Sequence, residues 1–296
     1  MLKQILFVFF VLSITCVSYA EVFWQPIFVH PFAQYTPRSP IVQNTNMYKT
    51  EYRKYYGHKN ECLIEGEGWI ECPSKAPIFK GQTEGEFYQF DAFGVSHRRK
   101  IGGPWKKIID FDHLNQLGSD WWRISFSSKE RIVAWTAERK FWVGNHRTTT
   151  IEYLQILNIK TGKLKTIELS HLYEPHDEKM GRGDAIVIPE LKMVVALSYS
   201  RTVDFEVNIA TIKGFSYDGK LMKTFPNINR YFQDNVVKLD MDMRFSNYVM
   251  ALGRDDQTGL LHFHNGHIGY GSMNHISGKT YQLDILNDAV IDGSLK

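Results

Sequence analysis

The chain has 296 residues, of which 43% are hydrophobic and 14% aromatic, enough apolar material for a sizeable core in one or two domains. Its formal net charge at pH 7 is only +3, which argues against nucleic acid as a partner. The sequence contains no P-loop, no G-x-S-x-G elbow, no H-E-x-x-H and no dinucleotide fingerprint, so these enzyme classes are not indicated and no cofactor is expected.

The first 20 residues have the pattern of a secretory signal peptide. Lys3 precedes an apolar run over residues 5–16, and small residues occupy positions 18 and 20, which a signal peptidase reads. The run is too short to span a membrane, and no later stretch reaches 18 unbroken apolar residues. We therefore expect cleavage before Glu21, a secreted extracellular protein and no membrane anchor.

Residues 21–60 are expected to form an extended arm. Four prolines between residues 26 and 40 interrupt any regular element. In the second half of the arm, the tyrosines at positions 48, 52, 55 and 56 have a helical spacing, which favours a short helix with an aromatic stripe. Residues 61–296 are expected to form a single domain.

Two cysteines, Cys62 and Cys72, remain once the signal peptide with Cys16 is removed. They flank a segment that is symmetric about Gly66-Glu67-Gly68, which predicts a three-residue hairpin loop with Cys62 opposite Cys72. A disulfide fits this register and an oxidising compartment. The alternative is two unpaired thiols.

A pattern of four apolar runs recurs three times in the domain, and each copy has a glycine followed by a lysine before its last run. These glycines are Gly162, Gly219 and Gly278, spaced by 219 − 162 = 57 and 278 − 219 = 59 residues. The runs are residues 123–126, 132–135, 153–159 and 164–169, then 185–188, 193–198, 207–215 and 221–225, then 236–241, 248–252, 260–268 and 280–285. Each glycine is predicted to form a tight hairpin between the last two strands of its copy, where a positive φ is needed.

A period near 58 residues with four strands in each unit is typical of an all-β, propeller-like ring of about four antiparallel blades. A degenerate first copy begins near Cys62. The alternative is a β-sandwich, because the same alternating runs would serve two packed sheets.

Candidate ligand residues lie near the first copy. Trp122 adjoins a loop and could present its ring to a sugar, but the pattern favours packing between units. The loop after this copy carries His171, His176 and Asp177, which could contact a ligand at one face of a ring. A solvated connector is the alternative for this loop.

Asp240 and Asp242 lie two residues apart at the start of the third copy and would share one face of an inner strand. Such a carboxylate pair could perform acid and base steps in glycoside cleavage, or be solvated edge charges. His262 and His264 also share a face, but two ligands do not define a metal site and none is expected.

The sequence therefore predicts a secreted binding or interaction protein with a ligand or partner at one mouth of a propeller. The expected partner is an extracellular protein or a glycan. The alternative is an extracellular carbohydrate-active hydrolase or lyase that uses axial carboxylates.

Overall fold

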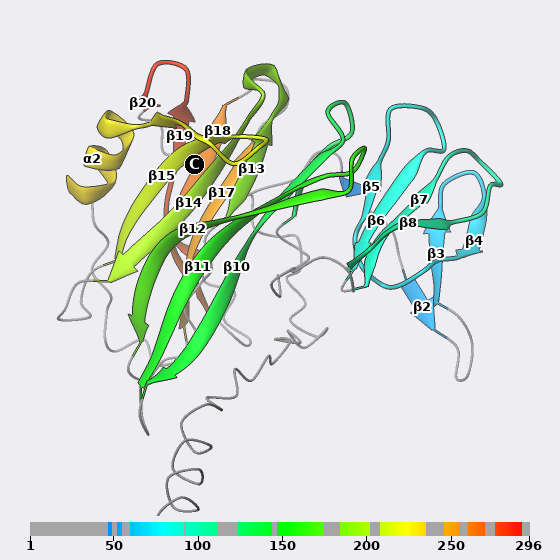
Figure 1. The fold of residues 1–296 in the computed structure, drawn as a ribbon, viewed down its shortest axis with the longest axis horizontal. Coiled ribbons are helices and arrows are strands. Elements are labelled where there is room, and N and C mark those ends of the chain that lie inside the picture. Colours follow the sequence, from blue (N-terminus) through cyan, green and yellow to red (C-terminus); the bar gives the residue numbers. More distant parts are fainter. Residues whose placement is uncertain are drawn as a thin grey trace, which may run out of the picture.

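The architecture is that of an all-β protein. This computed structural model describes residues 47–48, 52–54, 60–91, 93–111, 124–143, 147–174, 184–201, 208–234, 246–254, 260–269 and 276–291. Over these ranges the chain forms five antiparallel sheets and one α-helix, α2, together with a short 3-10 turn (Figure 1). The predicted all-β class with antiparallel units is confirmed. None of the described helices has the length and apolar character needed to cross a membrane.

The strands follow one another as meanders. The N-terminal sheet has the order β2-β3-β4 and contains β2 (Tyr52–Lys54), β3 (Asn60–Ile64) and β4 (Gly68–Glu71). The first sheet has the order β1-β5-β6-β7-β8 and contains β1 (Met47–Tyr48), β5 (Ile78–Lys80), β6 (Phe87–Asp91), β7 (Gly94–Arg98) and β8 (Lys106–Asp110). The unit expected to start at Cys62 is thus divided between two sheets.

Three four-stranded sheets complete the described part. The second sheet contains β9 (Ser125–Ser127), β10 (Ile132–Val143), β11 (Arg147–Asn158) and β12 (Lys163–Glu174). The third contains β13 (Ala185–Ile188), β14 (Met193–Arg201), β15 (Asn208–Ser216) and β16 (Leu221–Thr224). The fourth contains β17 (Ser246–Arg254), β18 (Leu261–Gly269), β19 (Ile276–Asp284) and β20 (Ala289–Ile291).

Two strands occupy the segment expected to be an arm. Tyr48 lies in β1 and Tyr52 in β2, where Tyr52 pairs with Cys62 of β3. The short helix predicted from the tyrosine spacing is therefore wrong at these two positions. Pairing with neighbouring strands outweighs the helical spacing here, since local patterns are weak against tertiary contacts.

The second and third sheets are each buried on both faces. In β10, Val133 and Trp135 pack against the first sheet, while Ile132 and Ala134 pack against the third. Side chains alternate between faces along a strand, so a run that is apolar at every position needs a neighbour on each side. The second sheet therefore lies between the first and third sheets, as Figure 1 shows.

The third sheet repeats this arrangement. Val194 and Ala196 of β14 pack against the second sheet, whereas Met193 and Val195 pack against the fourth. The sheets thus follow one another in space in the order in which they occur in the sequence.

The first strands of successive sheets are linked by side chains. The N–H of Val187 in β13 donates a 2.9 Å hydrogen bond to Oγ of Ser125 in β9. The N–H of Leu252 in β17 donates a 2.7 Å bond to Oδ2 of Asp184, which precedes β13. These bonds place β9, β13 and β17 side by side.

Two of the three predicted glycine hairpins are confirmed. Gly162 lies between β11 and β12 with a φ of 68°, and Gly219 lies between β15 and β16 with a φ of 89°. The third is wrong, because Gly278 lies inside β19 and pairs with Gly266 of β18. Asn265-Gly266, a dipeptide that is typical of hairpin turns, is likewise part of a strand.

In the fourth sheet, the hairpin turn between the last two strands, β19 and β20, lies instead at residues 285–288. Asp284 Oδ1 accepts hydrogen bonds from the N–H groups of Leu286 and Asn287 at 3.0 and 3.1 Å. Asp288 then takes the positive φ, at 50°. An aspartate can adopt this conformation because its short side chain tolerates the left-handed region.

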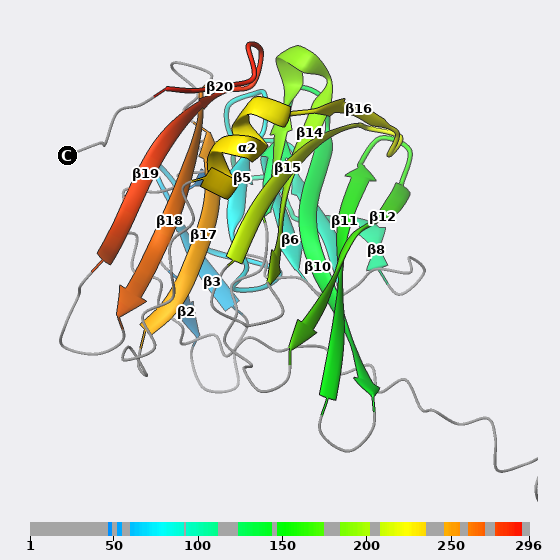
Figure 2. The ribbon, with the colours of Figure 1, turned by 90° about the vertical axis from the view of Figure 1, so that its left-hand side faces the viewer.

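Helix α2 (Pro226–Asp234) joins the third and fourth sheets. The helix lies beside β15 (Figure 2). Its buried Ile228 and Phe232 pack into the core between these sheets. The carboxylate of Asp288 accepts hydrogen bonds from the N–H groups of Asn227 and Ile228 at 3.0 and 3.2 Å, so it caps the helix from the β19–β20 hairpin. Lys223 Nζ adds a 2.7 Å bond to the carbonyl oxygen of Ile285.

Candidate functional site

The β3–β4 hairpin is closed by a disulfide between Cys62 and Cys72, as predicted. Their Cα atoms are 5.9 Å apart, and both side chains are buried. The bond closes a short loop whose tip carries Glu67. It therefore restricts where this carboxylate can lie.

The register of the hairpin differs from the prediction by two residues. Cys62 lies opposite Ile70 and Ile64 lies opposite Gly68, whereas the symmetric register placed the two cysteines opposite each other. Gly66 and Gly68 both have a positive φ, of 80° and 76°, and the turn is formed by residues 65–67. The disulfide consequently spans the two strands diagonally, a distance that side chains on one face can bridge.

Glu67 at the hairpin tip pairs with Arg98, the last residue of β7. Glu67 Oε2 accepts a hydrogen bond from Nη2 of Arg98 and a 2.8 Å bond from the N–H of Gly102. Arg98 Nε donates to the carbonyl oxygen of Gly103 at 2.9 Å. Arg98 is only 1% exposed, and a charge so deeply buried needs a partner of opposite sign.

The pairing also sets the ionisation of the acid. The hydrogen bond from Arg98 holds the pKa of Glu67 below its usual value, and it outweighs burial, which acts in the opposite direction. Glu67 is therefore a carboxylate at neutral pH, and it joins the hairpin to the first sheet.

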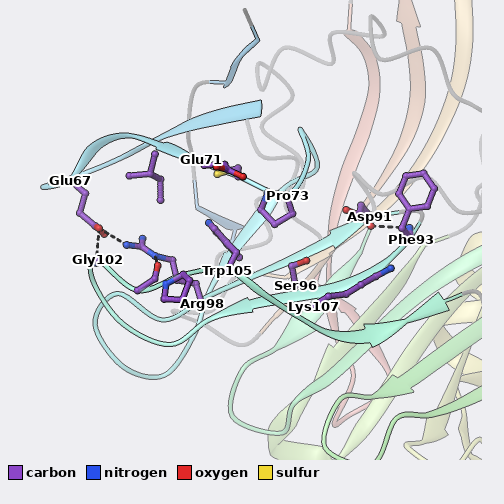
Figure 3. Close-up of a pocket in the computed structure, with 14 residues that line it drawn as sticks. Glu67, Glu71, Pro73, Asp91, Phe93, Ser96, Arg98, Gly102, Trp105 and Lys107 are labelled. Carbon is purple, nitrogen blue, oxygen red and sulfur yellow. Dashed lines mark hydrogen bonds and ion pairs between the residues drawn. The ribbon is translucent and has the colours of Figure 1, made fainter. Parts of the chain in front are cut away.

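A cavity of about 660 Å³ lies between this hairpin and the face of the first sheet formed by β7 and β8 (Figure 3). This volume falls in the range of small-molecule sites. The cavity is lined by Glu67, Ile70, Glu71, Cys72, Pro73, Asp91, Phe93, Ser96, Arg98, Gly102, Gly103, Pro104, Trp105 and Lys107. The disulfide and the Glu67–Arg98 pair thus both belong to its wall.

The lining combines flat apolar surfaces with about as many polar and charged side chains. Trp105 is half-buried against the core beneath the hairpin, and Phe93 is 64% exposed. Among the polar lining residues, Ser96 lies in β7 and Lys107 in the neighbouring β8. The wall is therefore mixed, with more charge than the mainly apolar wall of most small-molecule sites.

Three polar atoms of this wall are buried and have no hydrogen-bond partner among the described residues. They are Oε1 of Glu67, Nη1 of Arg98 and Nε1 of Trp105. A buried polar atom without a partner costs roughly 1–3 kcal/mol. All three atoms are covered by neighbouring groups, so they lie behind the cavity surface and not on it.

A second polar cluster lies on the first sheet outside the cavity. Glu86 Oε1 accepts from the hydroxyl of Tyr88 at 2.9 Å and contacts Nε2 of His97 at 3.0 Å. Its Oε2 accepts from the N–H groups of Gln82 and Thr83 at 2.8 and 3.2 Å. All these bonds fix the β5–β6 loop, which indicates a structural role.

The ionisation of this cluster agrees with that role. Burial raises the pKa of Glu86, but hydrogen bonds from Gln82, Tyr88, His97 and Thr83 outweigh it and bring the pKa to about 2. Burial lowers the pKa of His97 more than Glu86 raises it. His97 is therefore neutral at pH 7, and its contact with Glu86 is a hydrogen bond rather than an ion pair.

The cavity does not contain the residues that the sequence put forward as ligand contacts. Trp122, His176, Asp177, Asp240 and Asp242 lie outside the described residues. His171 lies in β12, where it pairs with Ile151 of β11. Their predicted roles remain predictions.

The histidines considered for a metal lie in one strand. His262 and His264 are both in β18, two positions apart. Within the described ranges there is no group of three or more His, Cys, Asp or Glu side chains that could hold a metal ion.

The sequence matches no protein-family profile, and no curated protein matches it significantly. Among solved structures, the endo-1,5-alpha-L-arabinanase from Thermotoga petrophila RKU-1 is similar, with a TM-score of 0.23 and 11% identity over 85% of this chain and 73% of that one. A TM-score this low supports no argument about fold or function.

Proposed function

We propose that this chain is a secreted extracellular binding protein with a propeller-like arrangement of sheets, and that its ligand occupies the cavity beside the β3–β4 hairpin. One observation carries the proposal. The cavity is preformed, because the Cys62–Cys72 disulfide and the pair of Glu67 with Arg98, which is 1% exposed, hold the hairpin that forms one of its walls. A preformed concave site that brings aromatic and polar side chains together is the usual form of a ligand pocket.

The packing of the sheets supports the propeller-like arrangement. Sheets that are buried on both faces, and whose first strands are hydrogen-bonded side by side, are expected of blades around an axis. A two-layer sandwich would leave one face of each sheet in solvent.

The state of Glu67 argues against this residue as the acid of a glycosidase in this cavity. A glycosidase needs a carboxylic acid that holds its proton near neutral pH. The pKa of Glu67 is lowered by its hydrogen bond with Arg98, so it cannot supply that proton. Binding of an extracellular protein or glycan without turnover is the expected behaviour.

A ligand screen with a blocked cavity tests the proposal. Ser96 is 8% exposed and lines the cavity, so Ser96→Leu should fill part of it without disturbing the opposite face of β7. We expect compounds or glycans that raise the melting temperature of the parent to lose this effect in Ser96→Leu. Ser128→Leu, in the β9–β10 turn, is the matched control and should respond as the parent does.

A panel without hits, or hits that persist in Ser96→Leu, would contradict a ligand site here. The same hits are then incubated with the protein and analysed for cleavage. Turnover would replace the binding proposal with the hydrolase or lyase alternative, for which Asp240 and Asp242 are the first residues to mutate.

Secretion is tested separately. The full chain is expressed in a secreting eukaryotic cell, and the medium is analysed by N-terminal sequencing and intact mass. We expect a mature chain that starts at Glu21 and gains 2 Da on reduction, because the reductant supplies two electrons that, with two protons, add two hydrogen atoms to one disulfide. Retention in the cell with residues 1–20 still attached would contradict an extracellular protein.

A further inference from the structure

We propose that the turns that follow the first strands of the second and third sheets bind an acidic polysaccharide, a glycan chain that carries sulfate or carboxylate groups along its length. These turns do not line the cavity, so the inference goes beyond the proposed function and shares with it only the expected extracellular location. It is carried by two basic residues, Arg131 and Lys192, that keep an unfavourable backbone conformation in equivalent turns.

Three residues other than glycine have a positive φ in the described part of the chain. They are Arg131 at 55°, Lys192 at 47° and Asp288 at 50°. A Cβ makes this left-handed conformation unfavourable, and glycine is the residue that adopts it freely. Asp288 offsets the cost, since its side chain caps α2. The side chains of Arg131 and Lys192 make no hydrogen bond or ion pair with any described residue, so nothing in the fold offsets theirs.

Arg131 and Lys192 occupy the same place in successive sheets. Residues 128–131 connect β9 with β10, and residues 189–192 connect β13 with β14, so each basic residue ends a turn and directly precedes a strand. Both side chains are exposed. A strained conformation that recurs with an exposed basic side chain is expected of a binding surface, because strain of this kind is concentrated at ligand sites.

The two turns are neighbours in space. Their preceding strands, β9 and β13, lie side by side. Burial raises the pKa of Tyr217, and the charges of Glu130 and Glu190 raise it further, so carboxylates from both turns lie near one hydroxyl group. One extended ligand can therefore reach Arg131 and Lys192 together.

The surface around these turns is basic. The β11–β12 turn adjoins the same place, because the N–H of Ile159 donates a 2.9 Å bond to the carbonyl oxygen of Arg131. The β15–β16 turn adjoins it through Tyr217. The exposed basic residues of the four turns are Lys129, Arg131, Lys160, Lys192 and Lys220, and their acidic residues are Glu130, Glu190 and Asp218.

One of these three carboxylates is already neutralised from outside the four turns. Arg254 Nη2 lies 2.9 Å from Oε2 of Glu190. None of the five basic side chains is paired with a described acidic residue. The turns therefore present a surplus of positive charge to an approaching anion.

The turns offer no apolar anchor for a folded protein. None of the exposed large hydrophobic side chains in the described ranges lies in them. Protein interfaces depend on a buried core that aromatic and other large side chains provide. A hydrated chain of anionic groups needs no such core, because charge-assisted bonds from Arg and Lys to sulfate or carboxylate hold it.

The test measures binding of four soluble polymers to the full secreted chain by calorimetry, at low and at physiological salt. Heparin is the sulfated glycan, polygalacturonate the carboxylated glycan, dextran the neutral control and polyglutamate the acidic peptide. We expect at least one acidic glycan to bind, with an affinity that falls as salt is added, and dextran not to bind.

The double variant Arg131→Gly plus Lys192→Gly should lower the affinity for that glycan about tenfold or more, because two charge-assisted contacts are lost. It should melt at or above the temperature of the parent, since glycine relieves the backbone strain. Lys75→Gln is the matched control. Lys75 is exposed and precedes β5, whose other end leads to Gln82 and its bond to Ser128. This variant should change the affinity by about twofold at most.

Binding that is lost while stability is kept is a result that a merely structural role of these residues does not produce. A double variant that melts below the parent would overturn the inference, because the two side chains would then stabilise their turns. Unchanged affinity in the double variant, or no binding of either acidic glycan, would also overturn it. Polyglutamate that binds as tightly as the glycans would replace the glycan with an acidic peptide. Ser96→Leu should bind the acidic glycan as the parent does, so the cavity is tested independently.

Discussion

The side chain of Asp184 and the backbone of Leu252 are joined by a hydrogen bond of 2.7 Å between sheets, from the N–H of Leu252 to Oδ2 of Asp184. The carbonyl oxygen of Asp184 also accepts a 2.7 Å bond from the N–H of Leu197. Asp184 is 5% exposed, so these bonds form away from water. One residue thus connects the first strand of the fourth sheet with the second strand of the third.

Replacement of Asp184 by Ala should lower the free energy of unfolding by about 1–3 kcal/mol, because it leaves the buried N–H of Leu252 without an acceptor. Asp184→Asn keeps an acceptor oxygen and should cost less. Urea denaturation of both variants provides the measurement. Equal stability of Asp184→Ala and the parent would mean that this bond does not hold the two sheets together.

Substitution by Val should lower stability by different amounts at Gly162, Gly219 and Gly278. Gly162→Val and Gly219→Val place a β-branched residue at a positive φ and should each cost about 1–2 kcal/mol or more. A Cβ at Gly219 would also approach Cδ1 of Ile167 to 3.2 Å. Gly278→Val lies within a strand and does not meet this turn strain. Thermal melts that rank Gly278→Val as the most damaging of the three would contradict this account of the turns.

Asp288 has two opposing effects on the stability of the fold, one as a helix cap and one through its backbone conformation, and substitutions can separate them. It caps α2 through both carboxylate oxygens, and it occupies a left-handed backbone conformation. Asp288→Asn keeps one acceptor and tolerates the conformation, so it should cost least. Asp288→Gly loses the cap but removes the strain, and Asp288→Ala loses the cap and keeps the strain. The expected order of melting temperatures is Asn above Gly above Ala, and an Ala variant above Gly would contradict it.

Glu86 should contribute to stability in a pH-dependent manner. Its pKa in the folded protein is about 2, against an ordinary value of 4.5, so its contribution is fully present above pH 4.5 and is lost as the pH falls toward 2. The contribution is on the order of 3 kcal/mol. Glu86→Gln should therefore be less stable than the parent at pH 7, and the two should converge near pH 2. Parallel stability curves between pH 5 and pH 2 would contradict this. Glu84→Gln, at an exposed position of the same loop, is the control.

The repeat could be predicted in part because two of its turns use glycine. Leu157-Asn158-Ile159 before Gly162 has a counterpart in Leu283-Asp284-Ile285 before Asp288, and Asn158 and Asp284 both accept hydrogen bonds from the N–H groups of the second and third residues after them. The glycine and lysine at 278–279 misled the prediction, because the true third turn uses aspartate for the positive φ. The polar side chain at the start of the turn, Asn158 or Asp284, was a better signal than the glycine.

The cavity could not be predicted, since its wall joins residues that are far apart in the sequence. Arg98 is part of a basic triplet that resembles an exposed strand end, and only its pairing with Glu67, 31 residues earlier, makes it a buried residue. Trp105 lies in a stretch without a periodic pattern. The available signal was Arg98 followed closely by Gly102, Gly103 and Trp105. No local rule, however, places these residues on the wall of one cavity.

The link between α2 and the β19–β20 hairpin has a consequence for how the molecule opens. Lys223 and Asp288 join the third and fourth sheets at their surface, and Ile228 and Phe232 join them in the core. Amide hydrogens of β15 and β19 should therefore exchange with solvent together, as one cooperative unit with a common opening free energy. Among the described residues, the hairpin around Glu67 packs on the first sheet and contributes no side chain to that unit, so its amide hydrogens should exchange independently of those of β15 and β19.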